Sequence, residues 1–199
     1  MAILTAFSST NDGFLQKDDA TYATANAAAT ADTATTNSAA TVCCENSPSY
    51  TIRRSGFFFD TSSIPVGSTI ESAVLTIVGS GSVNDTDNDK VNVYSLSAGG
   101  TLTTDDFGDF GTTPLSTEID IGSWDSGGDN DFTLNASGIA GLVLGGTSEL
   151  GLRLTRDVSA NQPTGNNSIT CVYADTGGAT RPKLVVTHFP FTPGIIGVY

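Results

Sequence analysis

The amino-acid sequence predicts an all-β protein, a jelly-roll-like β-sandwich of about nine or ten short strands with one short helix. Three observations support this fold class. Apolar residues alternate with polar ones over short runs, as in half-buried strands. Turn-forming residues separate the runs, among them 22 glycines and 7 prolines. One segment, near Ser137–Leu144, instead has apolar residues at helical spacing.

Two strands within Arg54–Val78 give the clearest pattern. Phe57 and Phe59 lie on one face of an extended chain, and the alternation resumes around Leu75 after a turn that contains Pro65. Apolar residues occupy both faces, so these strands are expected between two layers rather than at an edge. We therefore predict a core hairpin here.

The predicted helix rests on the spacing of Ile139, Leu142 and Val143, which stand at i, i+3 and i+4. Asn135 or Ser137 is a suitable N-cap. Consecutive glycines end the helix, at Gly145 and Gly146.

The other strands are predicted from shorter runs, of which Leu150, Leu152 and Leu154 form the clearest alternation. Residues 97–115 are predicted to form a long loop at one rim of the sandwich or across one face. The remaining strands are expected at 12–25, 91–96, 117–121, 132–134, 169–173 and 182–187.

One domain of residues 1–188 is expected, because a sandwich of this length commonly has a single core. Residues 26–49 are predicted to form an Ala- and Thr-rich excursion from it, irregular or a weak strand over 26–41, because polar interruptions and the lack of an apolar stripe oppose a helix. Residues 189–199 are predicted to form an apolar C-terminal arm.

The segment from Arg54 to Leu75, RSGFFFDTSSIPVGSTIESAVL, resembles the DNRLRE-type family of β-sandwich domains. Further matching pieces are DDATYATA at 18–25, FTLNA at 132–136, RDVS at 156–159, YAD at 173–175 and RPKLVVT at 181–187. The resemblance implies a fold related to carbohydrate-binding modules and jelly rolls, in adhesive or architectural proteins known from bacteriophage and metagenomic sequences. It implies no catalytic set.

The charge balance excludes several partners. Lys and Arg number 8 against 21 Asp and Glu, a formal net charge of -13. Such a chain is not expected to bind nucleic acid or an anionic membrane surface.

The start, MAILTAFSSTNDG, lacks the basic and apolar regions of a secretory signal. With Met1 present, we expect synthesis in a host cytoplasm and release with a particle, so that the protein resides on a virion or an extracellular surface.

The three cysteines do not suggest a disulfide scaffold. Cys43 and Cys44 are adjacent and are interpreted as two reduced thiols, and Cys171 as a small buried hydrophobe. The sequence contains no C-x-x-C spacing of the kind that indicates a metal site.

Two acidic loops are candidate sites. Asp85, Asp87 and Asp89 alternate in VNDTDNDKV, as do oxygen ligands at the start of a calcium-binding loop. The continuation of an EF-hand is missing, so both a calcium site and a solvated acidic loop remain open. No other cofactor is expected.

The second loop places Trp124 beside three carboxylates. An exposed aromatic ring next to polar groups is a common arrangement for sugar binding, whereas a buried Trp124 would belong to the core. The candidate carbohydrate residues are Trp124, Asp125, Asp129 and Asp131.

No catalytic motif is present. His188 is the only histidine, and no Gly-x-Ser-x-Gly elbow accompanies it. We therefore expect a protein that is not an enzyme.

The C-terminal arm carries a large apolar load for a segment with two prolines and two glycines. It could fold over its own sandwich, but the prolines favour an extended arm against a neighbouring subunit, together with Ile3, Leu4 and Phe7. The candidate assembly residues are Phe189, Phe191, Ile195, Ile196, Val198 and Tyr199.

Two functions follow as expectations. The first is a structural or adhesive protein of a virion or similar surface assembly, such as a capsid decoration, tail or fibre component, with other virion subunits and copies of itself as partners. The alternative is a carbohydrate-binding module that attaches to surface polysaccharide.

Overall fold

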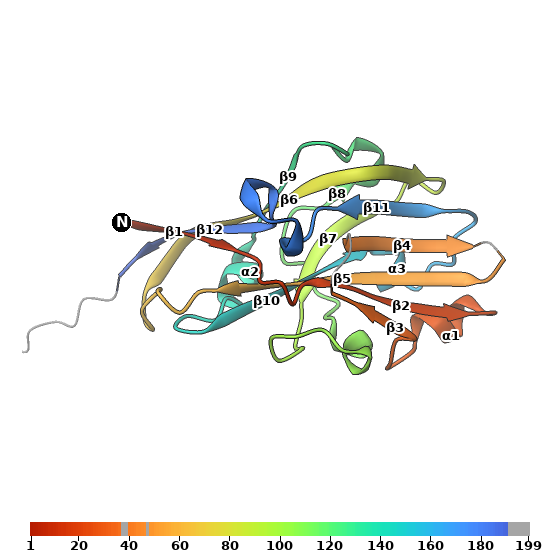
Figure 1. Cartoon of the computed structure of the whole chain (residues 1–199), viewed down its shortest axis with the longest axis horizontal. Helices are drawn as coiled ribbons and strands as arrows, with labels where there is room; N and C mark the ends of the chain where they lie inside the picture. Colours follow the sequence, from red (N-terminus) through yellow and green to blue (C-terminus); the bar gives the residue numbers. More distant parts are fainter. Residues whose placement is uncertain (37–39, 47, 191–199) are drawn as a thin grey trace, which may run out of the picture.

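A computed structural model describes residues 1–36, 40–46 and 48–190 of the chain. It confirms the all-β class, with twelve strands in the described residues instead of the predicted nine or ten. The strands pair throughout as antiparallel neighbours in one curled sheet (Figure 1). Their bounds are β1 Ala2–Phe7, β2 Gly13–Asp19, β3 Thr33–Thr35, β4 Ala40–Asn46, β5 Tyr50–Asp60, β6 Thr69–Asp85, β7 Lys90–Ser95, β8 Ile119–Asp120, β9 Asp129–Thr133, β10 Thr147–Leu154, β11 Asn167–Cys171 and β12 Lys183–Phe189.

The strand order along the sheet is β1-β12-β6-β11-β4-β5-β10-β7-β8, with β2 between β3 and β5 and with β9 on β6. Figure 1 shows β11, β4, β5 and β2 side by side in one layer. Strand β5 pairs with both β4 and β10 at successive positions along one edge, while β2 occupies its other edge. The sheet therefore branches at β5. The buried apolar residues of its strands form one core cluster.

Strands β5 and β6 are not a hairpin, which corrects the prediction. Two strands, β11 and β4, separate them in the sheet. The turn after β5 is tied to the start of β10 instead: Thr61 N–H donates to Gly146 at 2.8 Å, and Gly145 N–H donates to Thr61 at 3.3 Å. The expected burial on both faces is confirmed, because Phe57, Phe58 and Phe59 are all buried.

Strand β6 changes partners along its length. Its first part pairs with β12 and β9, and its last part pairs with β11. The change falls at Gly79–Gly81. A Cβ on Gly79 would lie 2.0 Å from the carbonyl oxygen of Asp125, and Gly81 has a φ of +85°. Glycine at these two positions lets the strand bend from one part of the sheet to the other.

The predicted helix is present as α2, Ala136–Ala140. The side chain of Asn135 caps it by accepting from Gly138 N–H at 3.0 Å. The helix ends at Gly141, earlier than the predicted Gly145 and Gly146.

The expectation of a single helix was wrong. The described residues also contain α1 (Tyr22–Asn26) and α3 (Thr155–Val158), together with the 3₁₀-helices η1 Thr104–Asp109, η2 Ile121–Ser123, η3 Ala174–Thr176 and η4 Gly178–Thr180. Each is too short to produce a helical period in the sequence. The sequence predicts a strand around Tyr22, where the structure instead has α1.

The Ala- and Thr-rich excursion of 26–49 is shorter than predicted. In its described part β3 is a weak strand, but β4 is a core strand, because β11 and β5 pair with it on both edges. Cys43 and Cys44 are free and fully buried, as is Cys171, and burial raises the pKa of each thiol, that of Cys171 to about 12.

The C-terminal strand β12 extends through Phe189, so this residue belongs to the sheet rather than to the predicted arm. Phe189 lies opposite Thr69 and is 47% exposed. The other predicted assembly residues, Phe191, Ile195, Ile196, Val198 and Tyr199, lie outside the described residues.

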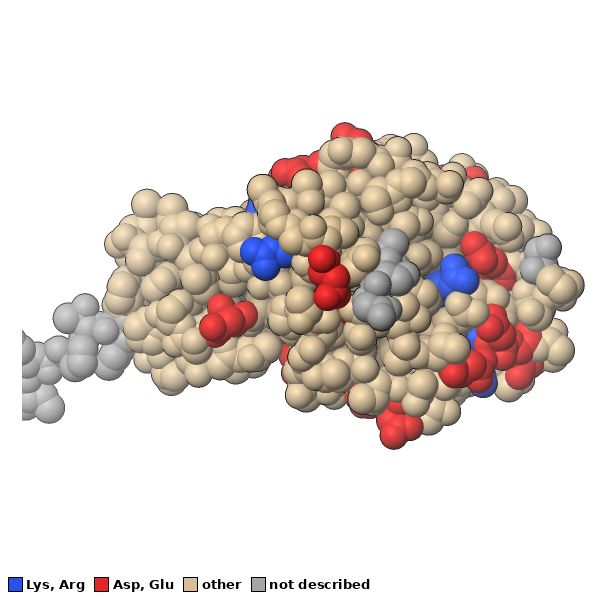
Figure 2. All heavy atoms as spheres, in the orientation of Figure 1, with Lys and Arg blue, Asp and Glu red and all other residues tan. Residues whose placement is uncertain are grey.

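Figure 2 shows carboxylates spread over the visible face, with few charged groups at the end that carries the N-terminus. Within the described ranges, no helix combines the length and the apolar character that a membrane span requires.

Candidate functional site

A groove of about 640 Å³ opens between β10 and α2 on one side and the end of β7 on the other. Four separate stretches of sequence converge on it. They include both ends of the long loop 97–115 that the sequence places at a rim or face. The lining residues are Ser95, Leu96, Ser97, Gly99, Thr113, Leu115, Ser137, Gly141, Val143, Thr147, Glu149 and Leu150.

The groove combines an apolar base with a polar rim. Leu96, Leu115 and Leu150 are buried and belong to the core cluster, so their inner parts are held in place by packing. The hydroxyl-bearing residues around them are exposed; they are Ser95, Ser97, Thr113, Ser137 and Thr147. A hydroxyl both donates and accepts hydrogen bonds, so the rim can match a ligand that does the same.

Glu149 supplies the one carboxylate among these lining residues. It is half-buried, and its Oε2 accepts from the N–H of Ala98 at 2.7 Å. That bond fixes the carboxylate while Oε1 has no hydrogen-bond partner among the described residues. One oriented oxygen is therefore available as an acceptor.

Backbone hydrogen bonds hold the walls of the groove together. Leu115 N–H donates to Val93 and Asn135 N–H donates to Leu115, both at 2.8 Å. Gly138 lets α2 approach closely, because a Cβ there would lie 2.3 Å from the carbonyl oxygen of Leu115. The walls are thus formed before any ligand arrives, which lowers the entropic cost of binding.

Trp124 lies elsewhere and is 6% exposed. Its ring packs against Phe132 with the centroids 6.3 Å apart, and its Nε1 faces Gly79. The indole offers no open face to a sugar in this structure. This is a correction to the sugar-stacking interpretation and supports the alternative that Trp124 belongs to the core.

The three carboxylates near Trp124 are exposed, and each interacts with a neighbouring group of the protein. Asp131 accepts from the Thr76 hydroxyl at 2.6 Å, Asp129 lies 3.4 Å from Lys183 Nζ, and Asp125 accepts from Gly127 N–H at 3.0 Å. None of them lines the groove.

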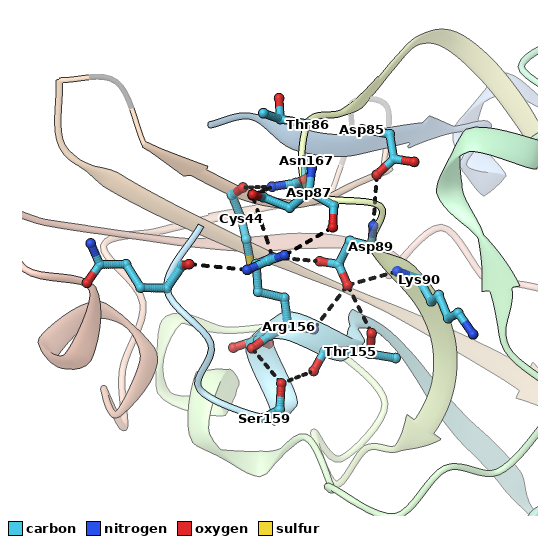
Figure 3. Close-up of polar contacts among 12 residues, drawn as sticks. Cys44, Asp85, Thr86, Asp87, Asp89, Lys90, Thr155, Arg156, Ser159 and Asn167 are labelled. Atoms are coloured by element: carbon cyan, nitrogen blue, oxygen red, sulfur yellow. Dashed lines mark hydrogen bonds and ion pairs between the residues drawn. The ribbon is translucent and has the colours of Figure 1, made fainter. Parts of the chain in front are cut away.

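The loop of Asp85, Asp87 and Asp89 forms a second polar cluster (Figure 3). Asp87 and Asp89 both face Arg156, whose Nε lies 3.7 Å and 3.5 Å from their Oδ2 atoms. Asp85 turns toward the loop itself and accepts from Asp89 N–H at 2.8 Å. The guanidinium of Arg156 thus provides the positive charge between the two carboxylates.

Asp89 is the most deeply placed of the three, at 4% exposed. Burial raises its pKa, although its Oδ1 accepts from Lys90 N–H at 2.8 Å and from the Thr155 hydroxyl at 2.9 Å. Burial would also raise the pKa of Asp87, but hydrogen bonds from Thr164 and Asn167 outweigh it and lower that pKa. A freely solvated loop is therefore wrong for these two residues.

Calcium at these residues remains a prediction from the sequence. In the described ranges, no group of three or more His, Cys, Asp or Glu side chains is placed to hold a metal ion. An ion that bound Asp87 and Asp89 together would have to displace Arg156. A calcium-dependent rise in melting temperature, lost on changing the three aspartates to asparagine, would test it.

A buried ionic network joins β5, β10 and α3. Arg54 binds Asp157 with two hydrogen bonds of 2.8 Å, and Arg153 Nε donates to the same carboxylate at 2.7 Å. Burial alone would raise the pKa of Asp157, but the two guanidinium groups lower it. Asp157 therefore pairs with arginines on β5 and β10, while its neighbour Arg156 faces Asp87 and Asp89.

Comparisons with known proteins leave the family open. No family model matches the chain, and no curated protein matches it, so the resemblance to DNRLRE-type domains stays a prediction. Among solved structures, the fold is similar to a xylan-binding module CBM15, with a TM-score of 0.43 and 10% identity over 93% of this chain and 97% of that one.

Sequence reasoning missed the groove residues. No motif marks them, because Ser95, Thr113, Ser137 and Glu149 stand in four separate stretches. The sequence does signal the Gly- and Thr-rich loop 97–115, which it predicts at one rim or across one face of the sandwich, but it indicates no ligand there.

Proposed function

We propose that this protein is a non-catalytic module that binds a segment of a neutral polysaccharide in the groove between α2, β7 and β10. The observation that carries the proposal is the pairing of a leucine base with a hydroxyl rim and one oriented carboxylate.

The chemistry of a sugar ring fits such a surface. Its C–H groups form an apolar face, and its hydroxyls donate and accept hydrogen bonds around the edge. Leu96, Leu115 and Leu150 would cover the apolar face, and the serine and threonine hydroxyls would meet the edge. Glu149 Oε1 would accept from a sugar hydroxyl, a charge-assisted bond stronger than a neutral one.

A neutral ligand is favoured over an acidic one. None of the lining residues is basic, and Glu149 would repel a carboxylate or sulfate on the sugar. The net charge of -13 adds a long-range repulsion of the same sign.

Binding without hydrolysis is favoured by the count of carboxylates in the groove. Glycoside hydrolysis generally uses two carboxylates about 5–9.5 Å apart, one as acid and one as base or nucleophile. The lining of this groove holds Glu149 alone.

The test is a screen of neutral and acidic glycans, followed by calorimetry with Glu149→Gln on any ligand found. Losing a charge-assisted hydrogen bond should weaken the Kd by roughly 10- to 100-fold. Glu118→Gln is the matched control, because Glu118 is exposed, pairs with Lys90 and lies outside the groove. Binding confined to acidic glycans, or equal effects of the two variants, would contradict the proposal.

A second candidate function is a structural component of a virion or other extracellular surface assembly. The observation that favours it is the uncharged, exposed N-terminal strand β1 beside the strand that leads into residues 191–199. Co-sedimentation with its particle should be lost when residues 190–199 are deleted from a chain that still folds. Retention of the truncated chain on the particle would contradict this candidate.

A further inference from the structure

A second cavity, of about 390 Å³, lies where α1, η1 and α3 meet β5 and β10. Its charged residues are buried: Arg54, Arg153 and Asp157 line it and are 3%, 5% and 2% exposed. Much of the remaining lining is small or apolar, and includes Ala27–Ala29 and Phe110. We call it the arginine cavity. The proposed function gives it no role.

The charges that line the arginine cavity do not balance. Arg54 and Arg153 carry two positive charges and Asp157 carries one negative charge, so the sum is +1. The carboxylate of Asp157 already accepts from both arginines, and also from Asn26 Nδ2 at 2.8 Å. Asp109 stands next to a lining residue on each side but does not itself line the cavity. One positive charge is therefore left for a ligand.

Arg153 supplies the free donor. Its Nε donates to Asp157 at 2.7 Å, and its Nη1 donates to the carbonyl oxygens of Phe110 and Gly111 at 3.3 Å and 3.0 Å. Its Nη2 has two N–H groups and no acceptor among the described residues. An anionic oxygen in the cavity would gain a charge-assisted hydrogen bond from Nη2. The three bonds fix the guanidinium before a ligand arrives, which lowers the entropic cost of binding.

The arginine cavity is separate from the groove, although both lie on one face of β10. Thr147 and Glu149 line the groove and Arg153 lines the cavity, and residues two apart along a strand share a face. Between them Phe110 covers Gly151, because a Cβ on Gly151 would lie 2.5 Å from the Phe110 ring. Four residues of strand separate Glu149 from Arg153 by about 13 Å, and salt screens charges beyond about 10 Å. Glu149 therefore opposes an anion in the groove but only weakly in this cavity.

We propose that the arginine cavity binds a single carboxylate group through Nη2 of Arg153. A carboxylate carries one negative charge and balances the excess of +1, whereas a phosphate group carries up to two. The exposed hydroxyl of Thr112 in the lining can donate to the second oxygen. Ala27–Ala29 and Phe110 can cover the carbon body that carries the carboxylate. The net charge of -13 opposes every anion at long range, so a Kd in the millimolar range is expected.

A carboxylate of this kind can belong to a free acid or to a sugar, and an NMR titration of the intact ¹⁵N-labelled chain separates the two. Sodium acetate and sodium glucuronate are added at constant ionic strength, with sodium chloride and glucose as comparisons. The amides of Ala27–Ala29 and Gly108 should shift and saturate with both carboxylates. A Kd for glucuronate at least about 10-fold below that for acetate assigns the carboxylate to a sugar, and a smaller difference assigns it to a free acid.

Ala29→Glu tests the position of the site without changing the buried network. Ala29 is exposed and lines the cavity, so the new side chain brings the protein's own carboxylate to Arg153. The Kd for acetate should rise about 10-fold or more, as expected for the loss of one charge-assisted hydrogen bond. Ala23→Glu is the matched control, because Ala23 is exposed on α1 but does not line the cavity.

The absence of saturable shifts in the intact chain would overturn the proposal. Equal saturation of the same amides by chloride or glucose would also overturn it, as would equal weakening by Ala29→Glu and Ala23→Glu, because the effect would then be one of overall charge. The amides around Glu149 report on the groove separately. A negative result at the arginine cavity therefore leaves the proposed function to its own test.

Discussion

Asp12 is a fully buried carboxylate in the loop between β1 and β2. Burial raises its pKa to about 6, even though Ala174 N–H lies 3.1 Å from both of its oxygens. The folded state thus binds this proton more tightly than the unfolded chain, whose aspartate titrates near 3.8. The contribution of Asp12 to stability is greatest below that value and falls as the pH rises through about 6.

Asp12→Asn should therefore raise the free energy of unfolding relative to the unmodified protein, and this gain should be larger at pH 8 than at pH 4.5. Each pKa unit corresponds to about 1.4 kcal/mol, so the gain is at most about 3 kcal/mol. Asparagine keeps an oxygen that can accept from Ala174. Thermal melts of both proteins across this pH range check it, and parallel pH curves would show that Asp12 does not control the difference.

Asp157 is the residue on which two buried arginines depend. Asp157→Ala leaves both guanidinium groups without their carboxylate, and breaking a buried pair in this way costs about 3–5 kcal/mol. Asp129→Ala removes an exposed partner of Lys183 and should cost less than about 1 kcal/mol. Urea denaturation measures both. A loss from Asp157→Ala no larger than that of the control would show that the network contributes little.

At the scale of the element, the pattern of apolar residues in the sequence predicted β5, β10 and β12. Of these, β12 is buried along one face, whereas β5 and β10 are buried on both faces over much of their length. The pattern missed β4, because Val42, Cys43 and Cys44 are consecutive and all buried, so the segment has no polar alternation. It also could not assign partners. The turn Asp60–Thr69 suggests a hairpin locally, but the bonds of Thr61 to Gly146 and Gly145 tie it to β10.

The bend in β6 provides a test at this scale. Gly79→Ala would place a Cβ 2.0 Å from the Asp125 carbonyl oxygen, and the required shift should cost about 1–3 kcal/mol or more. Gly127→Ala is the control, because a Cβ there meets nothing within 4 Å. Denaturation midpoints compare the two. Equal stability of the two variants would mean that the close approach at Gly79 does not hold the bend.

At the scale of the whole molecule, the fold class was accessible from the sequence, but the candidate site was not. Strand alternation is a local property, whereas the groove forms where segments such as 95–99 and 147–150 meet after folding. Trp124 illustrates the opposite error: an aromatic residue beside carboxylates suggests a sugar site, yet packing against Phe132 buries it. Whether a side chain such as that of Trp124 is buried depends on contacts with residues outside its own segment of sequence.

The central claim is that the groove is the binding site, and filling it is the most direct test. Gly141 lines the groove with a φ of -80°, and a Cβ there makes only ordinary contacts, so Gly141→Phe should fold with the ring in the groove. Gly127→Phe adds the same ring at an exposed position outside it. Calorimetry with a neutral oligosaccharide that binds the unmodified protein should show binding lost in Gly141→Phe and kept in Gly127→Phe. Undiminished binding by a folded Gly141→Phe protein would place the site elsewhere and contradict the account.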